Sequence, residues 1–295
     1  MASLRPYVLL VVLSVIWGVA FVAIRLAVGP PGFELTPVNL TLLRWFIVSA
    51  GFLAIYPVVV KPKVRFERKD FPRLLVVALT SVAIYHLSLN ASEKIVDASL
   101  AGLLISLAPL FIVLLSALVL HEKVRARLWV ALLIAFTGAA VISIPDLSLA
   151  SGDLAGPLLV VAAALSSATF AVASKPLVGK YGPFPVAAWA AFLGTAILVP
   201  LASPSLITQA EGLSVTGWAS VLYLAILSTI LANLIFYTLV MGQAVSRLGV
   251  QLYLVPVVSA FGGVLVLGET LGLEYKVLGG GLLLVAIWLG TSGRH

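Results

Sequence analysis

The chain has 295 residues, of which 62% are hydrophobic and only 10% charged, and its mean hydropathy is +1.18. Water cannot solvate a compact form of so apolar a chain, which excludes a soluble protein, and the lack of cysteine excludes disulfides, thiolate metal sites and a cysteine nucleophile. The net charge of +7 comes from Lys and Arg in short links between apolar runs, which is typical of contact with an anionic leaflet and not of nucleic-acid binding.

Apolar segments follow one another along the whole chain, each near the ~20 residues that a helix needs to cross a bilayer. The first follows Arg5, but it is too long for a signal peptide and has no clear cleavage site, so we expect it to be a retained span. An open strand would leave backbone groups unpaired in hydrocarbon. The sequence therefore predicts an all-α membrane protein with ten transmembrane helices, near residues 7–28, 37–60, 72–92, 97–119, 127–145, 155–175, 184–202, 216–240, 246–267 and 275–292.

Lys and Arg are distributed unequally between alternate links. With a cytoplasmic N-terminus, fourteen of them lie in inner links, whereas the outer links hold Lys94 and Lys276, and Arg25 lies at the outer end of the first span. The positive-inside rule then predicts a multi-pass protein of the cytoplasmic membrane with both termini in the cytoplasm.

The stretch LAPLFIVLLSALVLHE, residues 107–122, returns as LVPVVSAFGGVLVLGE at residues 254–269. Pro109 matches Pro256 and Glu122 matches Glu269, both pairs being 147 residues apart, which indicates an internal repeat.

The repeat extends to the first and sixth spans, because LLVV at 9–12 recurs at 158–161. Each unit thus contains five spans, and an odd number makes the second unit enter from the opposite face. We therefore predict two inverted five-helix repeats, residues 1–146 and 154–292, a plan common among secondary transporters.

Pro109 and Pro256 lie near the middle of their spans. Neither can donate to the carbonyl four residues back, so each is expected to bend its helix and to free the carbonyls of Ile105 and Leu252. We predict hinges beside a central path; the alternative is silent packing, since membrane helices tolerate proline.

Arg44 is the only full charge well inside a span, about 12 Å deep at ~1.5 Å per residue. Such a charge is costly in hydrocarbon unless it faces water, a cavity or a partner. It is a candidate anchor for a carboxylate or another acceptor on a solute. The alternative is a structural arginine that binds carbonyls or pairs with Glu34, Glu93 or Asp97.

Tyr85, His86 and Asn90 form a polar patch on the third span. At an offset of 147, His86 corresponds to Asn233 and Asn90 to Tyr237 on the eighth span. As a set, these five residues are predicted to line a solute cavity between the repeats. Each of them alone is also explained by hydrogen bonds between helices.

Trp17 and Gln251 are weaker candidates for the same cavity, and Trp17 could equally be packing. Glu122 is expected at a membrane surface, where capping, or ion pairing with neighbours such as Lys123 or Arg125, is favoured over transport chemistry. The run of glycines at 279–281 predicts close helix packing.

All eleven Asp and Glu residues fall in links, so no buried carboxylate is available as a proton or sodium relay. The sequence contains no P-loop, HExxH or GxSxG motif and no pair of acids suited to magnesium and a diphosphate. We therefore expect neither an enzyme nor a pump driven by ATP, and no cofactor or metal.

The two proline-and-glutamate stretches, LAPLFIVLLSALVLHEKV and LVPVVSAFGGVLVLGETL, resemble those of EamA-type transporters in the drug/metabolite transporter superfamily. Trp17, Gly18 and the arginine of the second span also look like the family, and the resemblance covers nearly the whole chain, at about 10–144 and 156–290. It implies spans one to four and six to nine around a central cavity, spans five and ten at the sides, and alternating access for amino acids, other small metabolites or drugs.

The second unit departs from this pattern, with Ser166 and Ser167 where Trp17 and Gly18 would fall and no arginine opposite Arg44. That difference assigns the solute-binding group to the first unit.

We interpret the chain as a carrier of a small metabolite, with amino acids among the expected solutes, that acts in the lipid bilayer as a monomer or homodimer. His86 is the one spanning residue suited to proton coupling. Two alternatives remain: a lipid-modifying membrane enzyme with His86 as base, which would want an acid or a metal ligand at matching depth, and a scaffold that transports nothing.

Overall fold

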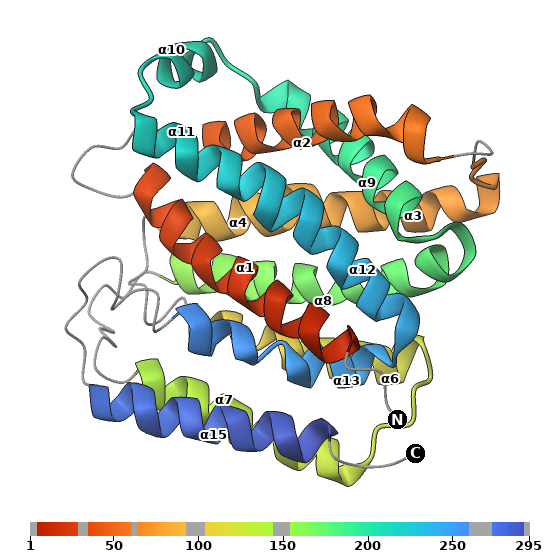
Figure 1. Cartoon of the computed structure of the whole chain (residues 1–295), viewed down its shortest axis with the longest axis vertical. Coiled ribbons are helices and arrows are strands. Elements are labelled where there is room, and N and C mark those ends of the chain that lie inside the picture. Colours follow the sequence, from red (N-terminus) through yellow and green to blue (C-terminus); the bar gives the residue numbers. More distant parts are fainter. Residues whose placement is uncertain are drawn as a thin grey trace.

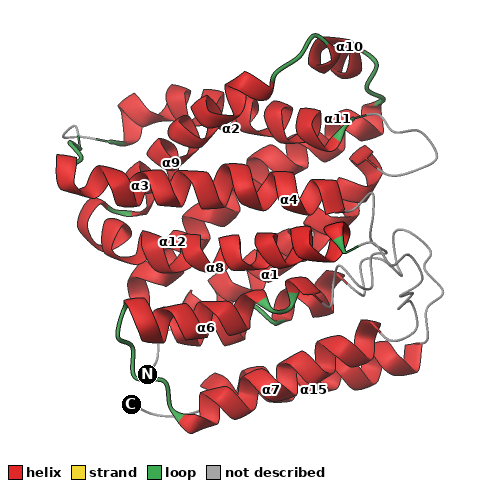
Figure 2. Cartoon of the chain, turned by 180° about the vertical axis from the view of Figure 1, so that it is seen from behind, coloured by secondary structure: helices red, strands yellow, loops and turns green. Residues whose placement is uncertain are grey.

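The computed structural model describes residues 5–28, 35–60, 64–92, 104–143, 154–259 and 273–291, and none of these residues forms a strand (Figure 2). Two helical stretches, η1 and η4, are 3-10 helices, and two others, η2 and η5, are π-helices. The elements are α1 (Arg5–Val28), α2 (Pro37–Val59), η1 (Arg68–Asp70), α3 (Phe71–Ala78), η2 (Leu79–Ile84), α4 (Tyr85–Ser92), α6 (Ala108–Val119), α7 (Ala126–Ser143), α8 (Ala155–Tyr181), α9 (Pro183–Leu198), η4 (Val199–Leu201), α10 (Ser205–Glu211), α11 (Val215–Leu222), η5 (Tyr223–Leu231), α12 (Ala232–Gly242), α13 (Val245–Gln251) and α15 (Leu273–Thr291).

Six of the described helical segments are long and apolar enough to cross a membrane. They are Pro6–Val28, Pro37–Val59, Arg68–Ser92, Ala155–Tyr181, Pro183–Leu201 and Val215–Gly242. Shorter apolar helices cover Ala108–Val119, Ala126–Ile142, Val245–Ser259 and Val277–Gly290. The prediction of an all-α membrane protein is confirmed.

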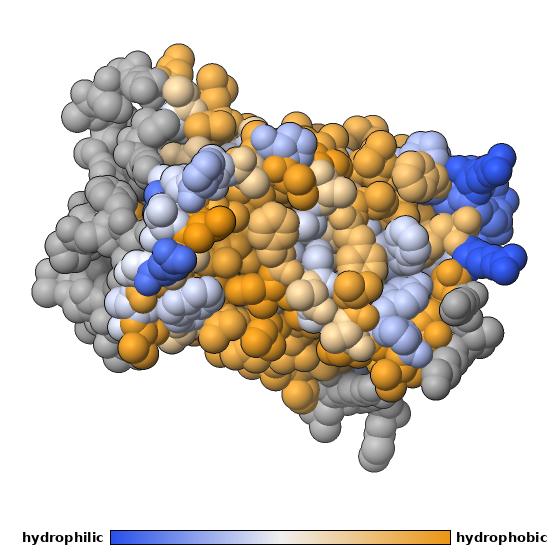
Figure 3. Space-filling view, turned by 90° about the horizontal axis from the view of Figure 1, so that it is seen from above, coloured by the Kyte–Doolittle hydropathy of each residue, from blue (hydrophilic) through white to orange (hydrophobic). Residues whose placement is uncertain are grey.

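The outer surface of the bundle is apolar. Leu53, Val58 and Leu133 are each about two-thirds exposed or more, at 67%, 72% and 67%. Figure 3 shows mostly hydrophobic residues across the middle of one face and strongly hydrophilic residues toward its ends. This distribution suits a protein whose middle is solvated by lipid.

Helices approach closely where one of them carries glycine. A Cβ on Gly279 of α15 would lie 2.5 Å from the carbonyl oxygen of Gly138 on α7, so these two helices pack backbone against backbone. α7 and α15 lie side by side in both views (Figures 1 and 2). The close packing expected for residues 279–281 is confirmed at Gly279; a Cβ on Gly280 or Gly281 would meet nothing within 4 Å.

The links α2–α3, α6–α7, α8–α9 and α12–α13 lie at one end of the bundle, which we call the basic end, and α10 lies at the other (Figure 1). Exposed cations at the basic end include Arg65, Arg68 and Lys123. The start of α1 and the end of α15 lie at this same end (Figure 1).

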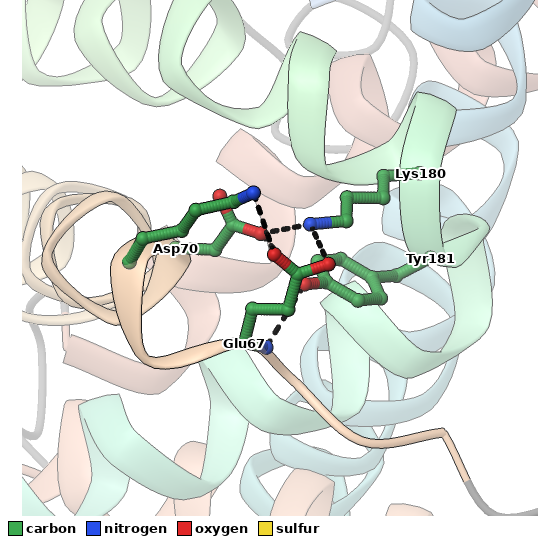
Figure 4. A network of polar contacts seen from close by, with 5 residues as sticks. Glu67, Asp70, Lys180 and Tyr181 are labelled. Atoms are coloured by element: carbon green, nitrogen blue, oxygen red, sulfur yellow. Dashed lines mark hydrogen bonds and ion pairs between the residues drawn. The ribbon is translucent and has the colours of Figure 1, made fainter.

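An ionic network at the basic end joins the α2–α3 link to the end of α8 (Figure 4). Lys180 lies between two carboxylates, with its Nζ 2.5 Å from Glu67 Oε1 and 2.7 Å from Asp70 Oδ2. The hydroxyl of Tyr181 donates to Asp70 Oδ2 at 2.6 Å and accepts from the backbone N–H of Glu67 at 3.0 Å. Hydrogen bonds from Lys180 and Lys69 hold the pKa of Glu67 below its ordinary value.

The third and eighth apolar segments each contain a π-helical stretch, η2 between α3 and α4, and η5 between α11 and α12. Each stretch receives a hydrogen bond from another helix. Ser166 Oγ on α8 donates to the Thr80 carbonyl of η2 at 2.9 Å, and Trp17 Nε1 on α1 donates to the Ser228 carbonyl of η5 at 3.2 Å. Such stretches are rare and often mark functional sites.

Candidate functional site

Thr41, Arg44 and Trp45 of α2 are buried, and their spacing places them near one side of the helix. Two of them meet α4, which runs antiparallel to α2 here. Asn90 Nδ2 donates to Thr41 Oγ1 at 2.9 Å, and one turn away the Trp45 ring contacts the His86 ring edge-on at 5.4 Å. Two residues of the predicted patch on the third span, His86 and Asn90, thus face α2.

Arg44 points to the π-helical stretch η5. Its Nε donates to Thr229 Oγ1 at 2.7 Å and its Nη2 to Ser228 Oγ at 3.4 Å, and the residue is only 5% exposed. These bonds to described side chains use two of the five N–H donors of a guanidinium. Glu34, Glu93 and Asp97, the acids considered as its partners, lie outside the described residues.

Trp17 reaches the same stretch, because its indole donates to the Ser228 carbonyl at 3.2 Å. Its ring also contacts that of Phe236 on α12 at 5.5 Å. η5 therefore gathers Arg44 from the second predicted span and Trp17 from the first.

Three buried polar atoms lie on the facing sides of α2 and α4 without a hydrogen-bond partner among the described residues: Trp45 Nε1, His86 Nδ1 and Asn90 Oδ1. A buried polar atom without a hydrogen bond lowers the stability of a protein by about 1–3 kcal/mol, and most buried polar atoms in native proteins have a partner. Three such atoms close together therefore need an explanation, and a bound solute is one. Trp45 offers a donor and Asn90 an acceptor. We call Arg44, Trp45, His86 and Asn90 the polar site.

The remaining candidates lie around this site or apart from it. Tyr85 contacts the His86 ring edge-on at 4.9 Å. Asn233 is half-buried on α12, near the end of η5. Tyr237 is buried against Phe170 and Phe236, with ring centroids 6.2 and 6.0 Å away. Since Phe236 also contacts Trp17, Tyr237 belongs to an aromatic group next to Trp17.

Gln251 belongs to another part of the molecule, since its Oε1 accepts from Gln243 Nε2 at 2.9 Å at the junction of α12 and α13. At this junction Lys175 Nζ donates to the carbonyls of Val240 and Gln243. The described hydrogen bond of the Gln251 side chain thus lies at the basic end and not at the polar site.

The expected bends at Pro109 and Pro256 take a different form. Pro109 lies in the first turn of α6, and the chain leaves helical geometry upstream of it, at Ser106 and Leu107. Residues 252–253 interrupt the helix before Pro256 in the same way. Proline is favoured in a first turn, where its missing N–H has no helical partner, so the break precedes the ring.

The prediction that the Leu252 carbonyl is free was wrong, because this carbonyl accepts a hydrogen bond from the backbone N–H of Val255 at 3.0 Å. Instead, the carbonyl of Ser106 accepts a side-chain hydrogen bond from Tyr253 at 2.8 Å.

Sequence reasoning missed Thr41, Trp45, Ser228 and Thr229. The adjacent hydroxyls of Ser228 and Thr229 inside an apolar span were a visible signal. Trp45 gave none, because a tryptophan beside a spanning arginine also suits a lipid-facing or packing role.

The sequence profile of the EamA-like transporter family matches residues 4–144 and again residues 154–291. The chain is 31% identical to a protein of Archaeoglobus fulgidus named an uncharacterized transporter, over 99% of this chain and 100% of that one. It is 33% identical to a probable terminal-alkyne amino-acid exporter of Streptantibioticus cattleyicolor, over 88% of this chain and 84% of the exporter.

A probable amino-acid metabolite efflux pump of Escherichia coli is 27% identical, over 99% of this chain and 96% of the pump. One solved crystal structure shares the fold with a TM-score of 0.74 at 21% identity, covering 99% of this chain and 98% of that chain.

Proposed function

The chain belongs to the EamA-like transporter family, and from this premise we propose that it is a secondary carrier that moves a small metabolite across the cytoplasmic membrane by alternating access. Amino acids are the solute class that we favour. The family and the named relatives are transporters, so the chain is not an enzyme and the lipid-modifying alternative falls away.

The polar site is the observation that carries this proposal. A buried guanidinium suits a carboxylate, the Asn90 Oδ1 acceptor suits an N–H donor, and the Trp45 indole suits an acceptor. An α-amino acid carries a carboxylate and an ammonium group on one carbon atom, so one small solute offers partners to the guanidinium, the Asn90 acceptor and the Trp45 donor. The exporter of Streptantibioticus cattleyicolor and the efflux pump of Escherichia coli are named for amino-acid solutes, which supports this choice.

We further propose that ten spans form two inverted units, residues 1–146 and 154–292. Tyr253 and Ser106, which touch, are 147 residues apart, and equivalent residues of two inverted copies meet only near the axis that relates them. The π-helical stretches support the same plan, because Trp17 and Ser166, 149 residues apart, each donate to the carbonyl of such a stretch in the other half.

In this proposal the basic end is cytoplasmic, as the positive-inside rule requires. The helix breaks before Pro109 and Pro256 would serve as hinges, since a break already lacks the continuous hydrogen bonds that make a helix stiff. Movement about them would expose the polar site to each side in turn.

The proposal is tested in proteoliposomes that contain the full-length chain. A thermal-shift screen of amino acids selects the solute that stabilises the protein most. Arg44→Ala should abolish its uptake, because the variant loses the group that meets the carboxylate, while Arg65→Ala, at an exposed position, should transport normally. Unchanged uptake by Arg44→Ala would remove the polar site from the mechanism.

A further inference from the structure

We propose that Thr229 is a positioning residue that aims the Arg44 guanidinium and thereby sets the preference of the carrier for solutes with a carboxylate. The inference rests on the proposed function, because it takes Arg44 as the group that meets the solute. It assigns specificity to a residue of η5 that is not itself charged.

The Thr229 hydroxyl has a fixed direction. Its oxygen accepts from Arg44 Nε at 2.7 Å, and its proton is donated to the carbonyl of Leu224 at 2.7 Å. Since that one proton is engaged inside the helix, the oxygen offers only lone pairs to its surroundings. A group that needs a donor, such as the guanidinium, is therefore the partner that fits.

The π-helical geometry is what orients this hydroxyl. Leu224 is five residues before Thr229, whereas the usual partner of a helical threonine is the carbonyl three or four residues back. Four threonines in α-helices, Thr41, Thr137, Thr169 and Thr238, bond the carbonyl four residues back. Thr229, at the seventh position of η5, bonds one residue further back than these four, as the wider turn of a π-helix allows.

Two anchored donors fix the plane of the guanidinium, because the group is rigid and planar. Arg44 Nε is held by Thr229, and Nη2 by Ser228 at a longer 3.4 Å. Both Arg44 and Thr229 are buried, at 5% and 1% exposure, so water is poorly placed to replace the threonine hydroxyl. Without the Nε anchor, the remaining donors would lose their fixed direction toward a carboxylate.

The test compares two solutes and three variants of the full-length chain in proteoliposomes. The solutes are the amino acid selected by the thermal-shift screen and its amide, in which the carboxylate is replaced. Thr229→Val removes the hydroxyl at nearly constant volume, and Thr229→Ser keeps it. Thr238→Val is the matched control, because among the described residues that hydroxyl bonds only the Leu234 carbonyl of its own helix.

We expect Thr229→Val to raise the KM for the amino acid about tenfold, as is typical when a hydrogen bond to a charged group is lost, and to leave kcat and the transport of the amide nearly unchanged. Thr229→Ser should keep the wild-type KM for both solutes, and so should Thr238→Val. If Thr229→Val is not monodisperse, Thr229→Ala takes its place.

Equal losses for the amino acid and the amide would assign Thr229 a merely structural role and overturn the inference. A Thr229→Val variant with wild-type kinetics would also overturn it, provided that Arg44→Ala abolishes uptake. If Arg44→Ala itself transports normally, the proposed function fails first, and the two failures are distinguished.

Discussion

The carboxylate of Glu122, in the link that follows α6, caps the first turn of α13 through Val245 and Ser246, more than 120 residues later in the chain. Oε1 accepts from the Val245 N–H at 2.9 Å, and Oε2 accepts from the N–H and the hydroxyl of Ser246 at 2.9 and 2.6 Å. An anion at a helix N-terminus is favourable, and Lys175 supplies the matching cation at the C-terminus of α12. Opposite charges thus hold the link between α12 and α13.

Replacing Glu122 by Ala should lower the free energy of unfolding by about 1–3 kcal/mol, because three donors would lose an ionised acceptor. Thermal unfolding in detergent measures the change. Glu211→Ala, at an exposed position on α10, is the control and should unfold like the wild type. Equal unfolding temperatures for Glu122→Ala and the wild type would contradict the role of the cap.

Gly194 on α9 lets that helix approach η2. A Cβ at this position would lie 2.3 Å from Val82 Cβ, so Gly194→Ala should force the helices apart and destabilise the protein by about 1–3 kcal/mol or more. Gly179→Ala on α8 should be neutral or slightly stabilising, because its Cβ would meet nothing within 4 Å. Comparing the two variants by thermal unfolding checks the helix contact, and an equal response would argue against it.

The ionic network around Glu67 should make the basic end sensitive to acid. The folded pKa of Glu67 lies below its ordinary value of 4.5, so its contribution to stability is present above 4.5 and is lost as the pH falls through the folded pKa. The unfolding temperature of the wild type should therefore fall more between pH 6 and about pH 3 than that of Glu67→Gln. Parallel curves for the two proteins would show that the network adds nothing to stability.

Trp17→Phe should keep the ring contact with Phe236 but lose the hydrogen bond to the Ser228 carbonyl. We expect a loss of about 1 kcal/mol in stability, since a buried carbonyl loses its side-chain donor. Trp189→Phe is a suitable control, because that indole bonds the Tyr56 hydroxyl at an exposed position. A Trp17→Phe variant as stable as Trp189→Phe would show that the indole N–H is dispensable.

Much of this molecule could be predicted from its sequence, because lipid leaves few options. Apolar length and backbone bonding dictate helices, so the all-α class could be predicted, and an arginine inside a span needs water, a cavity or a partner, so it could be predicted that Arg44 does not face lipid alone. The partners could not be predicted. A π-helical turn needs one extra residue per turn, and the uniformly apolar spans have no clear periodicity in which that residue would be visible.

Long-range pairings were also beyond local reasoning. Glu122 was expected to cap or to pair with Lys123 or Arg125; capping is confirmed, but the helix it caps begins at Val245. The contact between Glu122 and Val245 depends on how α6 and α13 pack together, and this packing cannot be read from the spacing of residues in the sequence. In the same way, the proline motif indicated a weak point in the helix but not that the break would come before the ring.

Because Glu122 binds α13, Lys180 neutralises Glu67, and Thr229 holds Arg44, each half of the polypeptide finishes what the other leaves open. A fragment of the first half alone would carry the Arg44 guanidinium into the bilayer without its hydroxyl partners, and a fragment of the second half alone would leave the first turn of α13 uncapped. Neither fragment is therefore expected to fold stably by itself, because each lacks a bonding partner that only the other supplies.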